Sequence, residues 1–363
     1  MGDSLEGQTT TVEAGGAGGS RQRSLVLVAG SGRSGTSLFT GILQRLGFYV
    51  PQPEVPADET NPRGFAESLW VVEFHTDLLR RTGVQITDAR PAAWAQTAKI
   101  DLDRDLQRKL RKWLKQQFRH GDDVVIKDPR LSWFLPLWRR CAEDVGASPR
   151  FVTVLRHPAA VVDSKQRWYG GWMGEVAKTA GWLNQTLFTE RATRDARRTF
   201  VRYDDLLDDW TRAVGRVGAA LDLGVLREAR LPKIRSAHEF VDRALSRSRG
   251  SWDDFKIPAA LREQTDNVWE LMSRLADADE DDVRSVLDSL DAAREAYVDL
   301  YGEAEAIAQS SILMARRRAA LDGRVSPRVA GLLRRVPEQH RRKVPPRLRS
   351  VIVRVLSAST SRR

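Results

Sequence analysis

The 363-residue sequence predicts an α/β fold in which helices flank a central parallel sheet. Two observations favour this class. Short apolar runs of strand length alternate with segments of helical period, as the crossover connections between parallel strands require. Glycines or charged residues follow these runs, and the carboxyl ends of parallel strands are where ligands bind in such folds. The composition, 41% hydrophobic and 29% charged, is that of a globular protein.

The predicted elements start at residue 24. Residues 24–29 (SLVLVA) form a continuous apolar run, which is typical of a buried parallel strand. Residues 36–46 follow as a helix that ends at Gly47. An amphipathic helix is predicted where apolar residues recur at helical spacing, at Leu102, Leu106, Leu110, Trp113, Leu114 and Phe118. Three further strands are predicted at 122–128, 150–158 and 197–207, the last running into a helix.

The chain is predicted to have three parts. They are a flexible, glycine-rich arm (1–23), a folded domain (24–302) and a basic tail (303–363) that is helical or disordered. Residues 316–363 hold 15 Lys or Arg and two acids, a net charge of +13. Because the whole chain carries +11, the remaining 315 residues carry −2. The basic character therefore belongs to the tail and not to the domain.

Three features of the sequence predict a cytoplasmic protein. The N-terminus lacks the apolar core of a signal peptide, and no stretch approaches the roughly 18 apolar residues of a membrane span. The single cysteine, Cys141, excludes an internal disulfide. The tail mixes arginines with Leu, Val and Ile, so it could lie on the anionic inner face of a membrane or be a solvated, disordered tail. It has no aromatic residue to stack on bases, which disfavours a nucleic-acid partner.

The segment GSGRSGTS (30–37) places Gly30, Gly35 and Ser37 on the G-x4-G-K-S/T frame of a phosphate-binding P-loop. Thr36 occupies the position of the lysine, and Arg33 is the cation of the loop. The backbone N–H groups and the helix N-terminus still offer an anion site. Without the lysine, a terminal γ-phosphate loses its main counter-charge, so a less highly charged anion is expected here.

A second motif, VLRHPAAVVDS (154–164), ends a strand with Arg156 and reaches Ser164 eight residues later. Together with the loop, it resembles the two nucleotide-binding signatures of sulfotransferases that use 3′-phosphoadenosine 5′-phosphosulfate (PAPS). The resemblance covers residues 24–255 and implies a bacterial-type, carbohydrate-sulfotransferase-like enzyme of the EC 2.8.2 type. It implies a P-loop NTPase-like three-layer fold. Further segments follow in the family's order at 61–68 (NPRGFAES), 126–138 (IKDPRLSWFLPLW) and 200–207 (FVRYDDLL).

The resemblance implies where the donor would bind. Arg156 and Ser164 would hold the 3′-phosphate, and Tyr203 would lie near the nucleotide. Arg249 and Gly250 match a late element that also touches this phosphate, although the family's second glycine is absent. The loop would hold the 5′-phosphosulfate through Ser31, Gly32, Arg33, Ser34, Gly35, Thr36 and Ser37. The product would be 3′-phosphoadenosine 5′-phosphate, and no metal is expected, because a sulfate carries less negative charge than a terminal phosphate.

The resemblance also implies catalytic residues. Arg33 would replace the absent lysine beside the bridging oxygen, and Lys127 would assist the leaving group. Cytosolic relatives carry a catalytic histidine two residues after this lysine, but Pro129 stands here. Carbohydrate-type relatives use a glutamate, and Glu67 is the expected base, with a structural salt bridge to an arginine as the alternative.

Two further candidates for the base are Asp128 and His75. A carboxylate before a proline at a strand end is often a structural cap, and a lone histidine is more often structural than catalytic. The acceptor would be a hydroxyl on a carbohydrate, a glycolipid or another small metabolite. Aromatic residues follow the second motif and would either stack on this acceptor or pack in the core: Trp168, Tyr169, Trp172 and Trp182.

Two alternative functions remain open at this point. One is a small-molecule kinase that uses ATP and Mg²⁺ with Asp128 as a metal ligand. The missing loop lysine and the Arg156–Ser164 pair count against it. The other is a non-enzymatic nucleotide-binding scaffold in which the basic tail binds a membrane. The sequence leaves the oligomeric state and the identity of the acceptor open.

Overall fold

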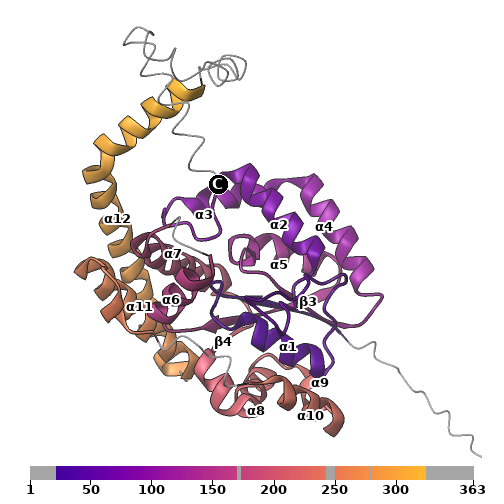
Figure 1. Ribbon diagram of the computed structural model, residues 1–363. Coiled ribbons are helices and arrows are strands. Elements are labelled where there is room, and N and C mark those ends of the chain that lie inside the picture. Colours follow the sequence, from indigo (N-terminus) through magenta and orange to yellow (C-terminus); the bar gives the residue numbers. More distant parts are fainter. Residues whose placement is uncertain (1–21, 170–172, 243–249, 278–279, 324–363) are drawn as a thin grey trace, which may run out of the picture. The chain divides into compact units, whose positions relative to one another are not determined.

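The computed structural model describes residues 22–169, 173–242, 250–277 and 280–323 (Figure 1). Contacts group the chain into two compact units, residues 1–300 and 301–363. The predicted arm and most of the predicted tail lie outside the described residues, as do Trp172 and Arg249. The predicted boundaries at 23 and 302 therefore stay predictions. Within the described ranges, no helix has both the length and the apolar character needed to cross a bilayer.

The centre of the fold is a four-stranded parallel sheet with the strand order β2-β1-β3-β4. Its strands are β1 (Arg23–Ala29), β2 (Asp123–Lys127), β3 (Ala147–Leu155) and β4 (Arg198–Arg202). In the register of the sheet, Leu27 of β1 lies between Ile126 of β2 and Phe151 of β3. All four predicted strands are present, which confirms the α/β class. The fourth runs into a helix as predicted, since β4 ends at Arg202 and α8 begins at Tyr203.

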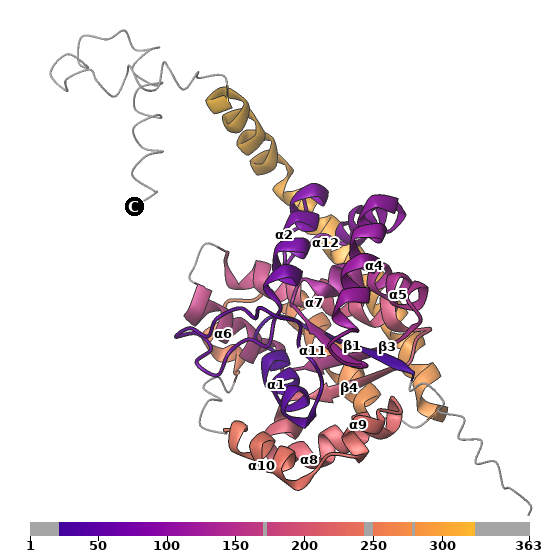
Figure 2. The same cartoon turned by 90° about the vertical axis from the view of Figure 1, so that its right-hand side faces the viewer.

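Helices cover both faces of the sheet, as Figures 1 and 2 show. Leu25 and Leu27 of β1 pack with residues of α2, α4 and α5, whereas Val26 and Val28 pack with α1, α8 and α10. The uninterrupted apolar run is therefore explained by burial on both faces. The α-helices are α1 (Thr36–Leu46), α2 (Leu69–Thr82), α3 (Ala93–Ala98), α4 (Arg104–Gln117), α5 (Leu135–Asp144), α6 (Pro158–Tyr169), α7 (Glu175–Thr193), α8 (Tyr203–Ala220), α9 (Gly224–Arg227), α10 (Leu231–Phe240), α11 (Ala259–Asp277) and α12 (Glu280–Gly323).

Short 3₁₀ helices are η1 (Lys99–Leu102), η2 (Leu131–Phe134) and η4 (Trp252–Asp254).

A third apolar cluster joins α7, α11 and α12 to Leu155 and Phe200 at the β3–β4 side of the sheet. It matters for function because it fixes α7, which lies beside the candidate site.

The helix predicted at 36–46 and the amphipathic helix predicted from Leu102 to Phe118 are both present, as α1 and α4. The helix at 36–46 has the predicted bounds and ends at Gly47, whose φ is 123°. The amphipathic helix begins later than its apolar pattern suggests. Asp103 accepts hydrogen bonds from the N–H groups of Asp105 and Leu106 and so fixes the start of α4 at Arg104. Leu102 precedes this cap and is 76% exposed, so its assignment to the buried stripe was wrong.

Candidate active site

The loop between β1 and α1 is shaped by glycines that no other residue could replace without strain. Gly30 has a φ of 139°, and a Cβ there would lie 2.6 Å from the carbonyl oxygen of Val154. Gly35 has a φ of 94°, and its Cβ would lie 2.2 Å from the ring of Tyr203. The first turn of α1 has no acidic residue and no side-chain cap. Its free backbone N–H groups are therefore open to an anion.

Arg33 joins this loop to the second motif. Its Nε donates to Ser164 Oγ at 3.0 Å, and its Nη1 donates to the carbonyl oxygen of Thr60 at 3.3 Å. Its own carbonyl oxygen accepts a hydrogen bond of 3.0 Å from Nη1 of Arg156. Two motifs more than 120 residues apart in sequence thus form one cluster of hydrogen bonds.

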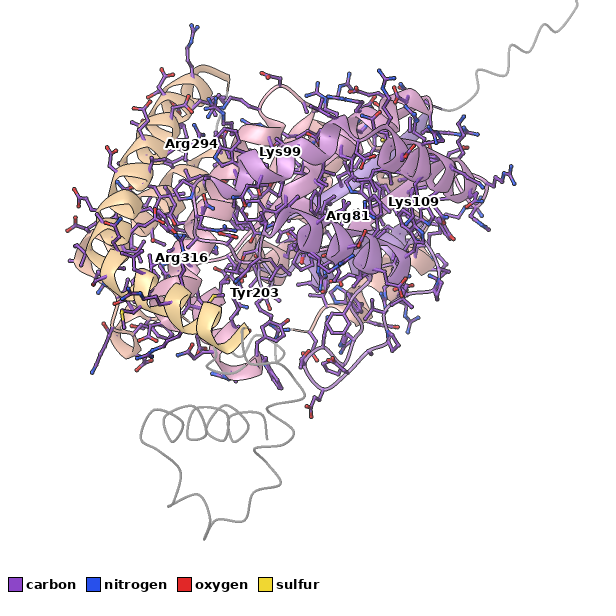
Figure 3. The ribbon with its side chains drawn as sticks, turned by 90° about the horizontal axis from the view of Figure 1, so that it is seen from above. Arg81, Lys99, Lys109, Tyr203, Arg294 and Arg316 are labelled. Atoms are coloured by element: carbon purple, nitrogen blue, oxygen red, sulfur yellow. The ribbon has the colours of Figure 1, made fainter. Side chains whose placement is uncertain are left out.

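Arg156 lies at the end of β3 and is 8% exposed. Its guanidinium carbon is 4.5 Å from the ring centroid of Tyr203, which is labelled in Figure 3. Burial lowers the pKa of Arg156 from its ordinary value. The same tyrosine ring packs against Gly35, so it contacts both the loop and the arginine.

The loop has no lysine of its own, but a lysine from β2 lies beside it. Lys127 ends this strand, is 3% exposed, and directs its ammonium group to the start of α1. Its Nζ donates to Ser37 Oγ at 2.8 Å, to the carbonyl oxygen of Phe65 at 3.2 Å and to Glu67 Oε1 at 2.5 Å. A fixed ammonium group therefore lies beside the anion loop although it comes from another strand.

Glu67 is a buried carboxylate at the edge of the same cavity and is 7% exposed. It lies just before α2, after the turn at Ala66, whose φ is 51°. Burial raises the pKa of Glu67 above its usual range, and the neighbouring ammonium of Lys127 opposes this shift. The ion pair that the sequence left as an alternative role exists, but with a lysine instead of an arginine.

Asp128 and His75 form a second buried pair that does not line the cavity. Trp138 Nε1 donates to His75 Nε2 at 2.8 Å, so the proton of this neutral ring is on Nδ1, which donates to Asp128 Oδ2 at 3.1 Å. Asp128 Oδ1 accepts from the backbone and guanidinium N–H groups of Arg130. Although burial acts to raise the pKa of Asp128, the hydrogen bond from His75 and the hydrogen bonds and charge of Arg130 hold it below its usual range. Both ring nitrogens of His75 and both carboxylate oxygens of Asp128 therefore take part in hydrogen bonds within the protein.

The residues of the two motifs surround a cavity of about 780 Å³. Of the predicted site residues, those that line it are Gly32, Arg33, Gly35, Thr36, Ser37, Glu67, Lys127, Arg156, Ser164 and Tyr203. Trp168 and Tyr169 also line it, whereas Trp182 is buried in the core. Their functional roles stay predictions.

Three predicted residues are placed elsewhere. Ser31 and Ser34 are buried behind the loop, where the hydroxyl of Ser34 donates to the carbonyl oxygen of Ser31. Gly250 does not line the cavity; it packs against the start of α6, and a Cβ there would lie 2.3 Å from the backbone nitrogen of Ala160. These residues therefore support the site from behind.

One wall of the cavity comes from an irregular segment, residues 85–90. No sequence motif marks this segment. Gln85, Ile86 and Thr87 line the cavity. Four backbone carbonyl groups of the segment accept side-chain hydrogen bonds: Ile86 from Trp133 (3.2 Å), Asp88 and Arg90 from Asn184 (2.9 and 2.8 Å), and Ala89 from Tyr297 (2.5 Å). This wall is fixed by residues of η2, α7 and α12.

Lys165 is a lining residue that lies outside both sequence motifs. It directly follows Ser164, and its Nζ donates to Ser31 Oγ at 2.9 Å and to Thr87 Oγ1 at 3.2 Å. The sequence did contain a signal for it. The helical spacing from Val161 through Lys165 to Trp168 places these residues on one face of α6.

In the part of the chain that the structure describes, no group of three or more His, Cys, Asp or Glu side chains is arranged to bind a metal ion. The two groups that the kinase alternative would use for Mg²⁺ have other partners. Ser37 accepts from Lys127, and Asp128 is bonded to His75 and Arg130.

Residues 26–227, more than half of the chain, match the profile of a family described as "Sulfotransferase family". Among solved structures, the sulfotransferase domain from the curacin biosynthetic pathway is similar, with 16% identity and a TM-score of 0.43 over 70% of this chain and 99% of that one. The sulfotransferase domain from the Synechococcus PCC 7002 olefin synthase has 19% identity and a TM-score of 0.42 over 70% and 96%. A search of curated proteins gave no match. On the family match, the chain belongs to the sulfotransferase family.

Proposed function

We propose that the protein transfers a sulfuryl group from PAPS to an acceptor hydroxyl on a carbohydrate, a lipid-linked molecule or another small metabolite. The observation that carries this proposal is that the two motifs are hydrogen-bonded to each other. Arg33 bonds to Ser164, Arg156 bonds to the Arg33 carbonyl group, and both arginines line the cavity that also holds the Lys127–Glu67 pair. A nucleotide with phosphate-type groups at both its 3′ and 5′ positions needs two such anion sites a short distance apart.

The residues present fit this donor. The loop offers backbone N–H groups at the start of α1, and Gly32 and Gly35 line the cavity without side chains. Seven Lys or Arg and three Asp or Glu line the cavity, which gives it a positive potential for a strongly anionic ligand. Its volume of about 780 Å³ is within the range of cofactor sites.

The cavity is best described as two halves. The donor half is formed by the anion loop (31–37) with Arg156, Ser164 and Tyr203. The acceptor half is formed by the 85–87 part of the wall with Lys165, Trp168 and Lys178. Lys127 and Glu67 are at the edge of the donor half, where Lys127 bonds to Ser37 in the first turn of α1.

Each residue of the donor half has a role that its chemistry supports. Arg156 and Ser164 would hold the 3′-phosphate, because a guanidinium and a hydroxyl recognise a dianion well. The loop would hold the 5′ end through its N–H groups, and Arg33 and Lys127 would donate to the oxygen that leaves with the nucleotide. PAPS supplies an activated sulfuryl group when bound, and the protein's contribution is alignment and charge stabilisation.

Glu67 would act as the general base. Its raised pKa brings a carboxylate closer to neutrality, which suits a group that accepts a proton from a hydroxyl near pH 7. Because Glu67 forms an ion pair with Lys127, the base and the cation for the leaving group would lie side by side. The proton and the negative charge that the reaction releases would therefore be taken up by adjacent, already oriented groups.

The direct test is calorimetric titration with 3′-phosphoadenosine 5′-phosphate without metal and, separately, with ATP and Mg²⁺. We expect the bisphosphate to bind without metal and Arg156→Ala to weaken it strongly. Tight binding of ATP that needs Mg²⁺, with none of the bisphosphate, would overturn the proposal and favour the kinase.

We also propose a cytoplasmic location with the basic tail on an anionic membrane surface. This part rests on the sequence of the tail, since residues 324–363 lie outside the described ranges. Deletion of residues 316–363 should abolish sedimentation with anionic liposomes, and unchanged sedimentation would contradict the idea.

A further inference from the structure

Lys165 is a buried ammonium group at the floor of the acceptor half. It is 5% exposed, and its Nζ donates to two neutral hydroxyl groups, Ser31 Oγ and Thr87 Oγ1. A lysine has three N–H donors, so these two bonds leave one donor for another partner. Because Lys165 lines the cavity, a bound ligand could reach that donor.

Within the described residues, no carboxylate forms an ion pair with Lys165. The charge that acts on it is a like charge, Lys178 of α7, which also lines the cavity and donates to Gln166 Oε1 at 2.5 Å. Burial first, and then this like charge, lower the pKa of Lys165 to about 7. Burying a cation without a counter-ion is costly and favours the neutral amine, whereas an anion bound beside it favours the charged form.

The groups around Lys165 are held in place before any ligand binds. Thr87 belongs to the wall segment, whose carbonyl groups accept bonds from Trp133, Asn184 and Tyr297. Gly181 of α7 lets this wall approach, because a Cβ there would lie 2.4 Å from Thr87 Cγ2. The hydroxyl of Thr87 accepts from Lys165, so its own proton can be donated to a ligand. Two convergent donors in a fixed arrangement suit an acidic group.

The donor half already has its own cations. Arg33 is bonded to Ser164, Arg156 to the loop carbonyl group, and Lys127 to Ser37 and Glu67. Lys165 instead lies between the loop and the wall that bounds the acceptor half. Its ammonium group therefore lies where the loop meets the wall, within reach of a molecule bound in the acceptor half.

We infer that the acceptor carries an acidic group, a carboxylate or a phosphate or sulfate ester, and that Lys165 and Thr87 bind it. This inference rests on the proposed function, since it assigns the acceptor half of the same cavity. The acidic group would anchor the acceptor at the floor while its hydroxyl is presented to Glu67. Lys165 is thus a residue that determines specificity for acidic over neutral acceptors.

The test uses small probes on the full-length protein saturated with PAPS, so that the donor half is filled. Acetate, methyl phosphate and uncharged acetamide are titrated separately, and binding is followed by saturation-transfer NMR. Acetate and methyl phosphate distinguish a carboxylate from a phosphate ester. The variants are Lys165→Met and, as a matched control, Lys99→Met at an exposed lysine outside the cavity lining (Figure 3).

We expect at least one charged probe to bind saturably and acetamide to bind at least about tenfold more weakly, since a hydrogen bond to a charged group is worth about 1.5–3 kcal/mol. Lys165→Met should remove this preference and Lys99→Met should keep it. The inference is overturned if neither charged probe binds, if Lys165→Met leaves binding unchanged, or if PAPS itself excludes the probes, which would assign Lys165 to the donor.

PAPS binding, measured first in the same samples, reports on the proposed function by itself. A protein that binds PAPS but no charged probe retains the function and loses the inference, whereas failure to bind PAPS removes the function. If Lys165→Met does not fold, a second measurement on the unmodified protein decides. Methyl phosphate should protect Lys165 from acetylation by an active ester, read by mass spectrometry, and absence of protection would refute the inference.

Discussion

The donor half and the acceptor half of the cavity are held in place in different ways. The donor half is built from pieces that each follow the end of a strand: the loop after β1 and Arg156 at the end of β3. The acceptor half depends on a segment without regular structure, whose carbonyl groups accept bonds from side chains of η2, α7 and α12. Local chain geometry therefore forms the first, and tertiary packing forms the second.

The two halves also differ in how their charges are balanced. At the edge of the donor half, the ammonium group of Lys127 is paired with the carboxylate of Glu67. Lys165 in the acceptor half has hydroxyl partners and a like charge nearby. If this difference is functional, variants of the two halves should affect different measurements. The predictions that follow are ordered from the largest expected effect to the smallest.

Glu67→Gln tests the group between the two halves and should have the largest effect. Loss of a general base should lower kcat by about 10²–10⁴-fold while leaving the affinity for the bisphosphate unchanged. In the unmodified enzyme, kcat/KM should fall as the pH drops through the raised pKa of Glu67, because only the ionised carboxylate accepts a proton. Steady-state kinetics with an identified acceptor measure both.

The matched control is Glu73→Gln, the same change at an exposed residue of α2 outside the cavity, which should leave kcat unaltered. Full turnover in Glu67→Gln would exclude this glutamate as the base.

Arg156→Ala should break the donor half alone. Truncating a buried guanidinium that binds a phosphate typically costs about 2–5 kcal/mol, so the bisphosphate should bind at least about 30-fold more weakly. Calorimetry measures this loss, and binding of acidic probes in the acceptor half should persist. Arg81→Ala, at an exposed arginine of α2, is the control. Equal affinity in both variants would remove Arg156 from the donor site.

Asn184→Ala should loosen the wall of the acceptor half. It removes the donor to the carbonyl groups of Asp88 and Arg90, and leaving buried carbonyl groups unpaired costs about 1–3 kcal/mol of the free energy of unfolding. Urea denaturation measures this loss. The KM for the acceptor should rise while the bisphosphate affinity is retained. A change in nucleotide affinity instead would show that the two halves are not separate.

The smallest predicted effect is a pH dependence of stability that comes from Lys165. Its pKa is lowered from 10.5 to about 7 in the folded protein, and the groups facing it are Ser31 of the loop, Thr87 of the wall and Lys178 of α7. Between these two values the unfolded chain binds more protons. The free energy of unfolding should therefore rise with pH through this window, by at most about 1.4 kcal/mol per pH unit from this residue.

Urea denaturation at several pH values from 7 to 9 checks this slope. Lys165→Met should lack it, so the difference from the unmodified protein should grow with pH. A difference that stays constant would mean that Lys165 keeps an ordinary pKa.

The sequence by itself determined the fold class and the two motifs whose residues line the cavity. The apolar runs predicted all four strands, because residues buried on both faces of a sheet leave a local signature. The glycines of the loop and the position of Arg156 and Ser164 were also readable, since strand, turn and helix follow within a few residues. These features depend on short-range sterics.

Only the tertiary structure decides that Lys127 lines the cavity and that Asp128 is buried away from it. Successive residues of a strand point to opposite sides, and the sequence could not show which side faces the cavity. Because α2 packs here, Lys127 donates to Glu67, which precedes this helix, and Asp128 accepts a hydrogen bond from His75 within it. Likewise, the wall depends on bonds such as that from Tyr297 to Ala89, which are 208 residues apart. Such contacts leave no local pattern, because they exist only once distant helices have packed.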